Sequence, residues 1–265
     1  MARSIYVTSP EGDSGKSMLA LGLVDLLART VKRVGVFRPV ARSTDVRDYV
    51  LELLLQHDGV DLTYDECVGV TYEQVLEDPE QALAQIVARY HDVERRCDAV
   101  VVVGTDYTDV AGPTELAYNA RIAANLGAPV VLVINGGHRK PAVVAQVADV
   151  VVTEMTANHA QVVAIVANRC APGSVSGVRD ALRAGTGLPA WAVPENPLLT
   201  APTVRQLSEA VHGTLIAGNP DRLALTVKTS MRYICTGSET RSPIRTAGVG
   251  LVGIATTSTR ANAWS

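Results

Sequence analysis

The sequence predicts an α/β fold in which helices cover both faces of a doubly wound, mainly parallel sheet. Strand-like and helix-like segments alternate along most of the 265 residues, as expected of successive parallel strands with right-handed crossovers. Three runs, 98–104, 129–135 and 162–168, are too uniformly apolar for half-exposed strands and fit the centre of a parallel sheet. Hydrophobic residues make up 47% of the chain but aromatic ones only 4%, so Ala, Val and Leu must fill the core.

Helix signals in the first half of the chain are of two kinds. In 16–30 and 45–57, apolar residues recur at helical spacing. At Asp78, an N-cap residue is followed by Pro79 at the first helical position and by Gln81 in the position of a capping box. The positions expected to face the core are Leu19, Leu23, Leu26 and Leu27 in the first helix, Val46, Val50, Leu53 and Leu54 in the second, and Leu83, Ile86, Val87 and Tyr90 in the third.

The remaining elements follow the same alternation. Gly127 is a suitable C-cap for a helix that covers about 114–126, because glycine adopts the left-handed conformation without penalty. The other expected elements are strands 4–8, 34–37 and 189–194 and helices 141–158 and 202–213.

The chain divides by composition near residue 225. We expect a P-loop-type domain over 1–225, because the alternating pattern continues to about that point. The stretch 226–265 is rich in Ser, Thr and Arg, its only acid is Glu239, and it shows no sustained period. Such a composition predicts a poorly ordered tail.

Charge and cysteine usage exclude several classes of protein. A net charge of −3 argues against binding nucleic acid through its phosphates. The four cysteines are scattered without a CxxC pair, which indicates reduced, mostly buried thiols. We expect a soluble cytoplasmic protein with no membrane contact, because the N-terminal segment turns polar too soon for a signal peptide and no run approaches a membrane span.

A phosphate-binding loop is predicted between the first strand and the first helix, in the stretch VTSPEGDSGKSMLALGL at 7–23. Backbone N–H groups at a helix start can hold a phosphate there, while Lys16 adds positive charge and the Ser17 hydroxyl binds Mg²⁺. Pro10 stands where the usual pattern has its first glycine, so the entry turn must differ. We expect ATP or another nucleotide with Mg²⁺ to bind the loop residues Gly12, Asp13, Ser14, Gly15, Lys16 and Ser17.

Three further positions at strand ends are candidate ligand residues. Arg38 ends the second strand, from which its charge could face the loop. Asp106 follows a buried strand, where a second Mg²⁺-organising carboxylate belongs. Asn168 ends another buried strand at the edge where ligands bind, and its amide could pair with a purine or merely satisfy a turn.

Taken together, these segments resemble the dethiobiotin-synthetase-like branch of the P-loop NTPase proteins. They are most similar to the N-terminal domain of long-form bacterial phosphate acetyltransferases, on the evidence of YVTSPEGDSGKS, RVGVFRPVAR, DAVVVVGTDYTDV, NARIAANLGAPVVLV, VANRC and VPENPLLTAPTV. The resemblance implies a role in regulation and assembly within an enzyme that converts acetyl-CoA and phosphate to acetyl phosphate and CoA. The implied partners are a phosphate-bearing small molecule, the acyltransferase part of the family protein and further copies of the chain.

The same resemblance implies that catalysis resides elsewhere. The family carries its acyltransferase domain after this one, and forty residues cannot hold it, so we expect no catalytic residue and no acetyltransferase activity in this chain. One alternative is an ATP-dependent ligase of the dethiobiotin synthetase type, supported by Lys16 and Ser17 but opposed by Pro10 and by Arg38 in place of the usual Lys. A partition-type ATPase is weakened by the absence of a second loop lysine near position 11.

Overall fold

The computed structural model describes residues 3–43, 45–105, 108–137, 139–201, 203–210, 214–217 and 253–255. The chain forms two compact units, Met1–Glu195 and Asn196–Ser265, and each is described by itself. The predicted domain end at residue 225, and all of 226–265 except 253–255, lie outside the described residues.

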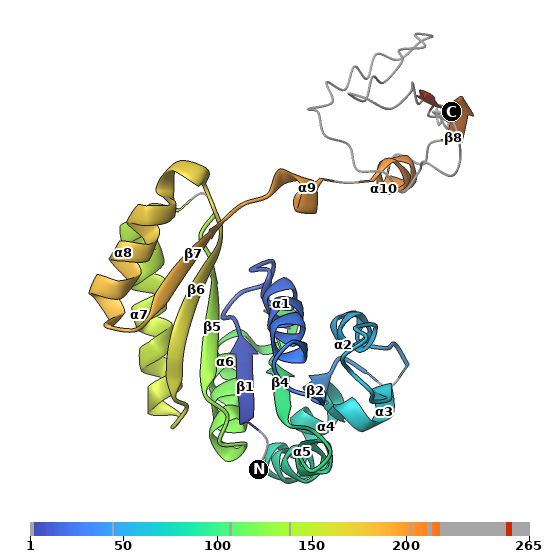
Figure 1. Ribbon diagram of the computed structural model, residues 1–265, viewed down its shortest axis with the longest axis vertical. Coiled ribbons are helices and arrows are strands. Elements are labelled where there is room, and N and C mark those ends of the chain that lie inside the picture. Colours follow the sequence, from blue (N-terminus) through green and yellow to red (C-terminus); the bar gives the residue numbers. More distant parts are fainter. Residues whose placement is uncertain are drawn as a thin grey trace, which may run out of the picture. The chain divides into compact units, whose positions relative to one another are not determined.

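A seven-stranded sheet forms the centre of the first unit (Figure 1). Its strand order is β3-β2-β4-β1-β5-β6-β7, and all neighbouring strands are parallel. This arrangement confirms the predicted doubly wound fold, since β2, β3 and β4 lie on one side of β1 and β5, β6 and β7 lie on the other. The strands are β1 (Arg3–Thr8), β2 (Val34–Ala41), β3 (Val68–Thr71), β4 (Ala99–Val103), β5 (Val130–Asn135), β6 (Val162–Cys170) and β7 (Ala190–Pro194).

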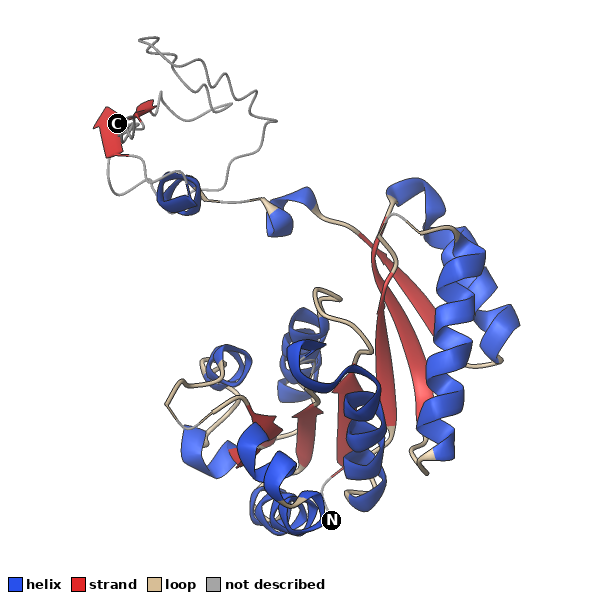
Figure 2. Cartoon of the chain, turned by 180° about the vertical axis from the view of Figure 1, so that it is seen from behind, coloured by secondary structure: helices blue, strands red, loops and turns tan. Residues whose placement is uncertain are grey.

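Helices cover the two faces of this sheet and create two apolar clusters. On one face, α1 (Lys16–Ala28) and α2 (Tyr49–Leu55) pack against β1, β2 and β4. On the other face, α5 (Pro79–Glu94), α6 (Thr108–Asn125), α7 (Pro141–Ala157) and α8 (Val175–Thr186) follow one another across the strands. Figures 1 and 2 show α7 and α8 side by side over β6 and β7. The short helices α3 (Tyr64–Cys67) and α4 (Tyr72–Glu77) flank β3.

Several local predictions are confirmed. Asp78 caps α5, where its carboxylate accepts hydrogen bonds from the N–H groups of Glu80 and Gln81 at 3.1 and 3.0 Å, with Pro79 at the first helical position. Gly127 follows α6 with φ of 58°. The long apolar runs form β4, β5 and β6. β4 and β5 lie on either side of the central strand β1, and β6 lies next to β5.

Two predicted helix faces were partly wrong. The helix expected over 45–57 begins only at Tyr49, because Asp48 caps it with a bond to the Leu51 N–H at 3.0 Å, and Val46 is 67% exposed. In α1, the fully buried apolar residues are Ala20 and Val24, and the small side chain of Ala20 allows close approach to the sheet. Leu19, Leu23 and Leu27 are only partly buried, and Leu26 is 58% exposed.

The second unit contains short elements. They are α9 (Pro197–Thr200), α10 (Val204–Ala210), β8 (Thr214–Ala217) and β9 (Gly253–Ala255). β8 and β9 pair in antiparallel fashion, so three residues of the predicted tail form a strand. Across the described part of both units, every helix falls short of the length and apolarity that a bilayer span requires.

Candidate functional site

The loop between β1 and α1 has the backbone of an anion-binding turn. Gly15 caps α1 with φ of 80°, a left-handed conformation that favours glycine, and Asp13 also has a positive φ of 53°. A Cβ atom at Gly15 would lie 2.1 Å from Nδ2 of Asn168, whereas one at Gly12 would meet nothing within 4 Å. The first N–H groups of α1 therefore face a loop that only glycine at position 15 can form, and such helix starts bind anions.

Two buried cations converge beside this loop. Lys16 is 2% exposed, and its Nζ donates a hydrogen bond to the Gly104 carbonyl at 2.6 Å. Nη1 of Arg38, which is also 2% exposed, donates to the same carbonyl at 2.6 Å. The segment after β4 thus brings together two of the residues singled out in the sequence, one from the start of α1 and one from β2.

Arg38 is anchored by a carboxylate that the sequence had not indicated. Its Nε donates to Oδ2 of Asp48 at 2.9 Å, and both side chains are almost fully buried. The charged pair fixes the Arg38 fork next to the loop, since a guanidinium presents several donors in a rigid plane. Asp48 also caps α2, so the same carboxylate ties that helix to β2.

Side chains from the far half of the sheet hold the loop in place. Nδ2 of Asn168 donates to the Ser14 carbonyl at 2.9 Å, and Nη1 of Arg169 donates to the Asp13 carbonyl at 2.9 Å. Arg169 adopts a left-handed φ of 61° and also binds Glu195 at 3.1 Å. These contacts place Asn168 against the loop backbone, while the purine contact considered for it stays a prediction.

An ion pair also holds the entrance of the loop. Glu11 and Arg139 form a two-pronged ion pair with distances of 2.8 and 2.7 Å, and Oε1 of Glu11 also accepts the Asn135 N–H at 3.0 Å. This pair joins the β1–α1 loop to the segment after β5. The sequence signal that could have suggested this ion pair is a negative residue in the loop together with a positive residue after a distant strand.

The loop contains a buried hydroxyl that is unsatisfied within the described residues. Ser14 is 1% exposed, and no hydrogen-bond partner for its Oγ is found in that part of the chain. A buried polar atom without a partner costs about 1–3 kcal/mol, so a ligand oxygen at the loop would remove this cost. The Oγ1 atom of Thr8, at the end of β1, is in the same situation.

Comparison with protein families assigns the domain. The family model AAA_26, described as an AAA domain, matches residues 3–203. The chain belongs to this AAA domain family. The match covers all seven strands of the sheet, the phosphate loop of the domain and the residues that hold that loop.

Curated relatives of this AAA domain carry the name of the predicted family. The chain is 29% identical over 236 residues to a phosphate acetyltransferase of Nitratidesulfovibrio vulgaris, covering 83% of this chain and 33% of the relative. It is 24% identical over 228 residues to a phosphate acetyltransferase of Synechocystis, covering 82% and 33%. The predicted similarity to phosphate acetyltransferases is confirmed, and the chain spans about one third of the length of these relatives.

A solved structure supports the fold of the AAA domain. The MinD cell division protein of Aquifex aeolicus superimposes with a TM-score of 0.50 at 16% identity, covering 75% of this chain and 84% of that protein. At this identity the likeness concerns the fold alone.

Metal binding can be assessed for only one of its two predicted residues. Ser17 lies in the first turn of α1 with a half-buried side chain, directly after Lys16. Asp106 lies outside the described residues. Within those residues, no group of three or more His, Cys, Asp or Glu side chains could hold a metal by itself. A cation here would therefore depend on the Ser17 hydroxyl and on the phosphate oxygens of a ligand.

The segment after β4 is fixed by a buried network that the sequence analysis missed. Oδ1 of Asn119, in α6, accepts the Tyr6 hydroxyl at 2.7 Å and the Thr105 N–H at 3.0 Å. Nδ2 of Asn119 donates to Oγ1 of Thr105 at 3.1 Å. Burial raises the pKa of Tyr6 well above its usual value, against the opposing effect of the Arg38 charge. The tyrosine therefore stays a neutral donor, and the Gly104 carbonyl between the two cations keeps its position.

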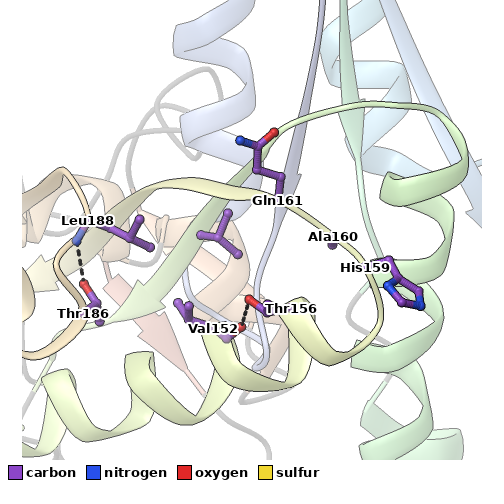
Figure 3. A pocket seen from close by; sticks show the side chains of 8 residues that line it. Val152, Thr156, His159, Ala160, Gln161, Thr186 and Leu188 are labelled. Atoms are coloured by element: carbon purple, nitrogen blue, oxygen red, sulfur yellow. Dashed lines mark hydrogen bonds between the residues drawn. The ribbon is translucent and has the colours of Figure 1, made fainter.

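A separate cavity of about 330 Å³ lies at the opposite, amino edge of the sheet (Figure 3). The hydroxyls at its wall are already used, since Thr156 donates to the Val152 carbonyl at 2.8 Å and Thr186 accepts the Leu188 N–H at 3.3 Å. His159 also lines the cavity, with no carboxylate among the other lining residues to pair with it. These groups give no basis for recognising a ligand there.

Proposed function

We propose that this AAA domain binds the phosphate groups of a nucleotide, with ATP and Mg²⁺ as the first candidates, at residues 12–17. The observation that carries the proposal is the junction of Gly15 and Lys16, where a left-handed glycine opens α1 beside a buried ammonium group. Backbone donors, the helix dipole and the lysine charge act on an anion in the same place. The buried Ser14 hydroxyl fits the same ligand class, because a phosphate oxygen would accept its hydrogen bond.

Each residue has a separate part in the proposed site. Lys16 would contact a phosphate oxygen, and its ammonium can do so beside Gly104 because it carries three donors. Ser17 would hold Mg²⁺, with Asp106 as the proposed second carboxylate. When bound, Mg²⁺ would neutralise negative charge on the phosphate groups. Arg38 adds positive charge from β2, and Asn168 and Arg169 keep the loop closed.

We further propose that the domain serves regulation and assembly within a phosphate acetyltransferase. The support is the similarity to two enzymes of that name over one third of their length. In this proposal the partners are the acyltransferase part of the protein and further copies of the chain, in the cytoplasm. The reaction itself, the conversion of acetyl-CoA and phosphate to acetyl phosphate and CoA, takes place outside this domain.

Calorimetric titration of ATP, ADP and NADH tests the phosphate site. We expect Lys16→Ala to weaken binding by about 1.5–3 kcal/mol, the range of a hydrogen bond to a charged group, which is tenfold or more in affinity. Lys32→Ala is the matched control, since Lys32 is an exposed residue just after α1. Equal affinity of the wild type and Lys16→Ala would remove the loop from the proposal.

A second candidate is an ATP-dependent ligase of the dethiobiotin synthetase type. The observation in its favour is that a second cation meets Lys16 at one carbonyl, because transferring phosphoryl groups are stabilised by such pairs. That cation is Arg38, and an arginine in place of the usual lysine still counts against the ligase. We expect slow or no turnover, because Pro10 alters the loop entrance. Rapid Mg²⁺-dependent phosphate release that is lost in Asp106→Ala, or conversion of a diamine and bicarbonate to a cyclic urea, would favour the ligase.

A further inference from the structure

A second cavity lies at the carboxyl edge of the sheet, the edge that also carries the phosphate loop. Its volume is about 350 Å³, which lies within the size range of small-molecule sites. Val40, near the end of β2, and Thr105, just after β4, belong to its wall, and α4, α5 and α6 supply the remaining lining residues. Each of these elements belongs to the first unit, so the cavity is formed within one compact body.

Among the described lining residues, the wall of this cavity is largely apolar and aromatic, with one carboxylate. Val75 and Leu76 of α4 provide aliphatic surface, and Tyr72 and Tyr118 provide two aromatic rings. The hydroxyl of Tyr118 is occupied, because it donates to the Pro79 carbonyl at 3.2 Å. Glu115, at the wall in α6, is the acidic group among the described lining residues.

Within the part of the chain that the structure describes, the charges around the cavity favour a cationic ligand. Arg121, the lining residue that could attract an anion, is held by Glu80 at 2.6 Å, and nearby Arg38 is held by Asp48. The charge of Glu115 adds to burial in raising the pKa of Tyr72, so the carboxylate lies close to that ring. A carboxylate has about four acceptor sites, so Glu115 can accept hydrogen bonds from a ligand in addition to its present contacts.

We propose that this cavity binds a small organic cation with an apolar body, a site separate from the phosphate loop. A primary ammonium group would donate to Glu115, while the hydrocarbon part lies against Val75 and Leu76. The faces of Tyr72 and Tyr118 add to the preference for positive charge, since aromatic rings attract cations within about 6 Å. The proposal rests on the cavity and its residues, and it stands whether or not the loop binds nucleotide.

The segment Gly104–Thr105 connects the cavity to the phosphate loop. Thr105 lines the cavity, and the preceding residue, Gly104, accepts the hydrogen bonds of Lys16 and Arg38. Asn119 lies in α6 one turn after Glu115, and its side chain forms hydrogen bonds with the N–H and the hydroxyl of Thr105. A ligand that displaces this segment would therefore displace the carbonyl that positions both cations.

Titration of the full chain with hexylammonium, hexanoate and 1-hexanol, followed by NMR, tests the site. We expect hexylammonium to bind at least tenfold more tightly than hexanoate. Glu115→Gln should weaken hexylammonium binding about tenfold and leave 1-hexanol binding unchanged, because only the charged contact is lost. Glu77→Gln is the matched control, since it removes an exposed carboxylate from α4 outside the cavity and should change nothing.

A second variant keeps the test valid if Glu115→Gln does not fold. Leu76 lines the cavity but is 61% exposed, so Leu76→Lys should fold and should reduce hexylammonium affinity by placing a positive charge at the cavity. The proposal is overturned by any of three results: no saturable hexylammonium binding, hexanoate binding as tight as hexylammonium, or affinity unchanged in every folded variant of Glu115 and Leu76.

Discussion

At the scale of single residues, Gly15 determines whether the loop can close. We predict that Gly15→Ala destabilises the protein and abolishes phosphate binding, because alanine pays about 1–2 kcal/mol in the left-handed region and its Cβ would clash with Asn168. Thermal unfolding and ATP titration measure the two effects. Gly12→Ala is the control, since space is open there, and a Gly15→Ala protein that behaves like it would show that the loop tolerates another backbone.

The buried pair of Arg38 and Asp48 permits a second prediction. Asp48→Asn should lower the free energy of unfolding by about 3–5 kcal/mol, because it leaves a buried guanidinium without its carboxylate. Asparagine is also a good N-cap, so the start of α2 is preserved and the loss reports the charge. Denaturant unfolding should show a much smaller change for Asp180→Asn, whose pair with Arg179 is exposed. Similar losses in both variants would contradict the argument.

The residues of the site differ in how far a sequence can predict them. Lys16 was found from the loop pattern between a strand and a helix. Arg38 was found at the predicted end of the second strand, although β2 continues past it to Ala41. Asp48 and Asn119 were missed as site residues because the partners that bring them to the site lie far away in the sequence. A partner of that kind is defined by tertiary structure, so neither spacing nor residue type identifies it.

At the scale of elements, the loop is held by the ends of strands from the other half of the sheet. We predict that Arg169→Lys weakens ATP binding several-fold with little change in thermal stability. Lysine cannot bind the Asp13 carbonyl and Glu195 at once with the fork of arginine, and the side chain is partly exposed. Arg179→Lys, on the outer surface of α8, is the matched control and should leave ATP affinity unchanged. A drop in stability equal to the loss of binding would show a purely structural role.

The predictability of the elements follows their length and periodicity. Strands β4, β5 and β6 were predicted from long apolar runs, whereas β3 spans only Val68–Thr71 and is too short to show a period. Helix α8 was missed although Val178 and Leu182 are spaced for one buried face, because Gly177 and Gly185 lower its helix propensity. The start of α2 was misplaced because Asp48, and not the apolar pattern, sets it.

At the scale of the whole molecule, the question is whether this one domain can bind both ligands that acetyl transfer requires. Transfer of an acetyl group between acetyl phosphate and CoA requires two ligands to be positioned against each other. Along the described residues, Gly15 and Lys16 belong to the one proposed anion site, and the second cavity at that edge presents Glu115, which repels phosphates. The sequence match also spans only one third of each phosphate acetyltransferase relative.

We therefore predict that the purified chain has no phosphate acetyltransferase activity. Incubation with acetyl phosphate and CoA should give no increase in thioester absorbance, because the cavity at the same edge of the sheet carries the Glu115 carboxylate, which disfavours a second phosphate-bearing ligand there. An active full-length relative serves as the positive control. Activity that follows this chain through purification, and that is lost in Lys16→Ala but not in Lys32→Ala, would assign the chemistry to the loop and contradict the proposed regulatory role.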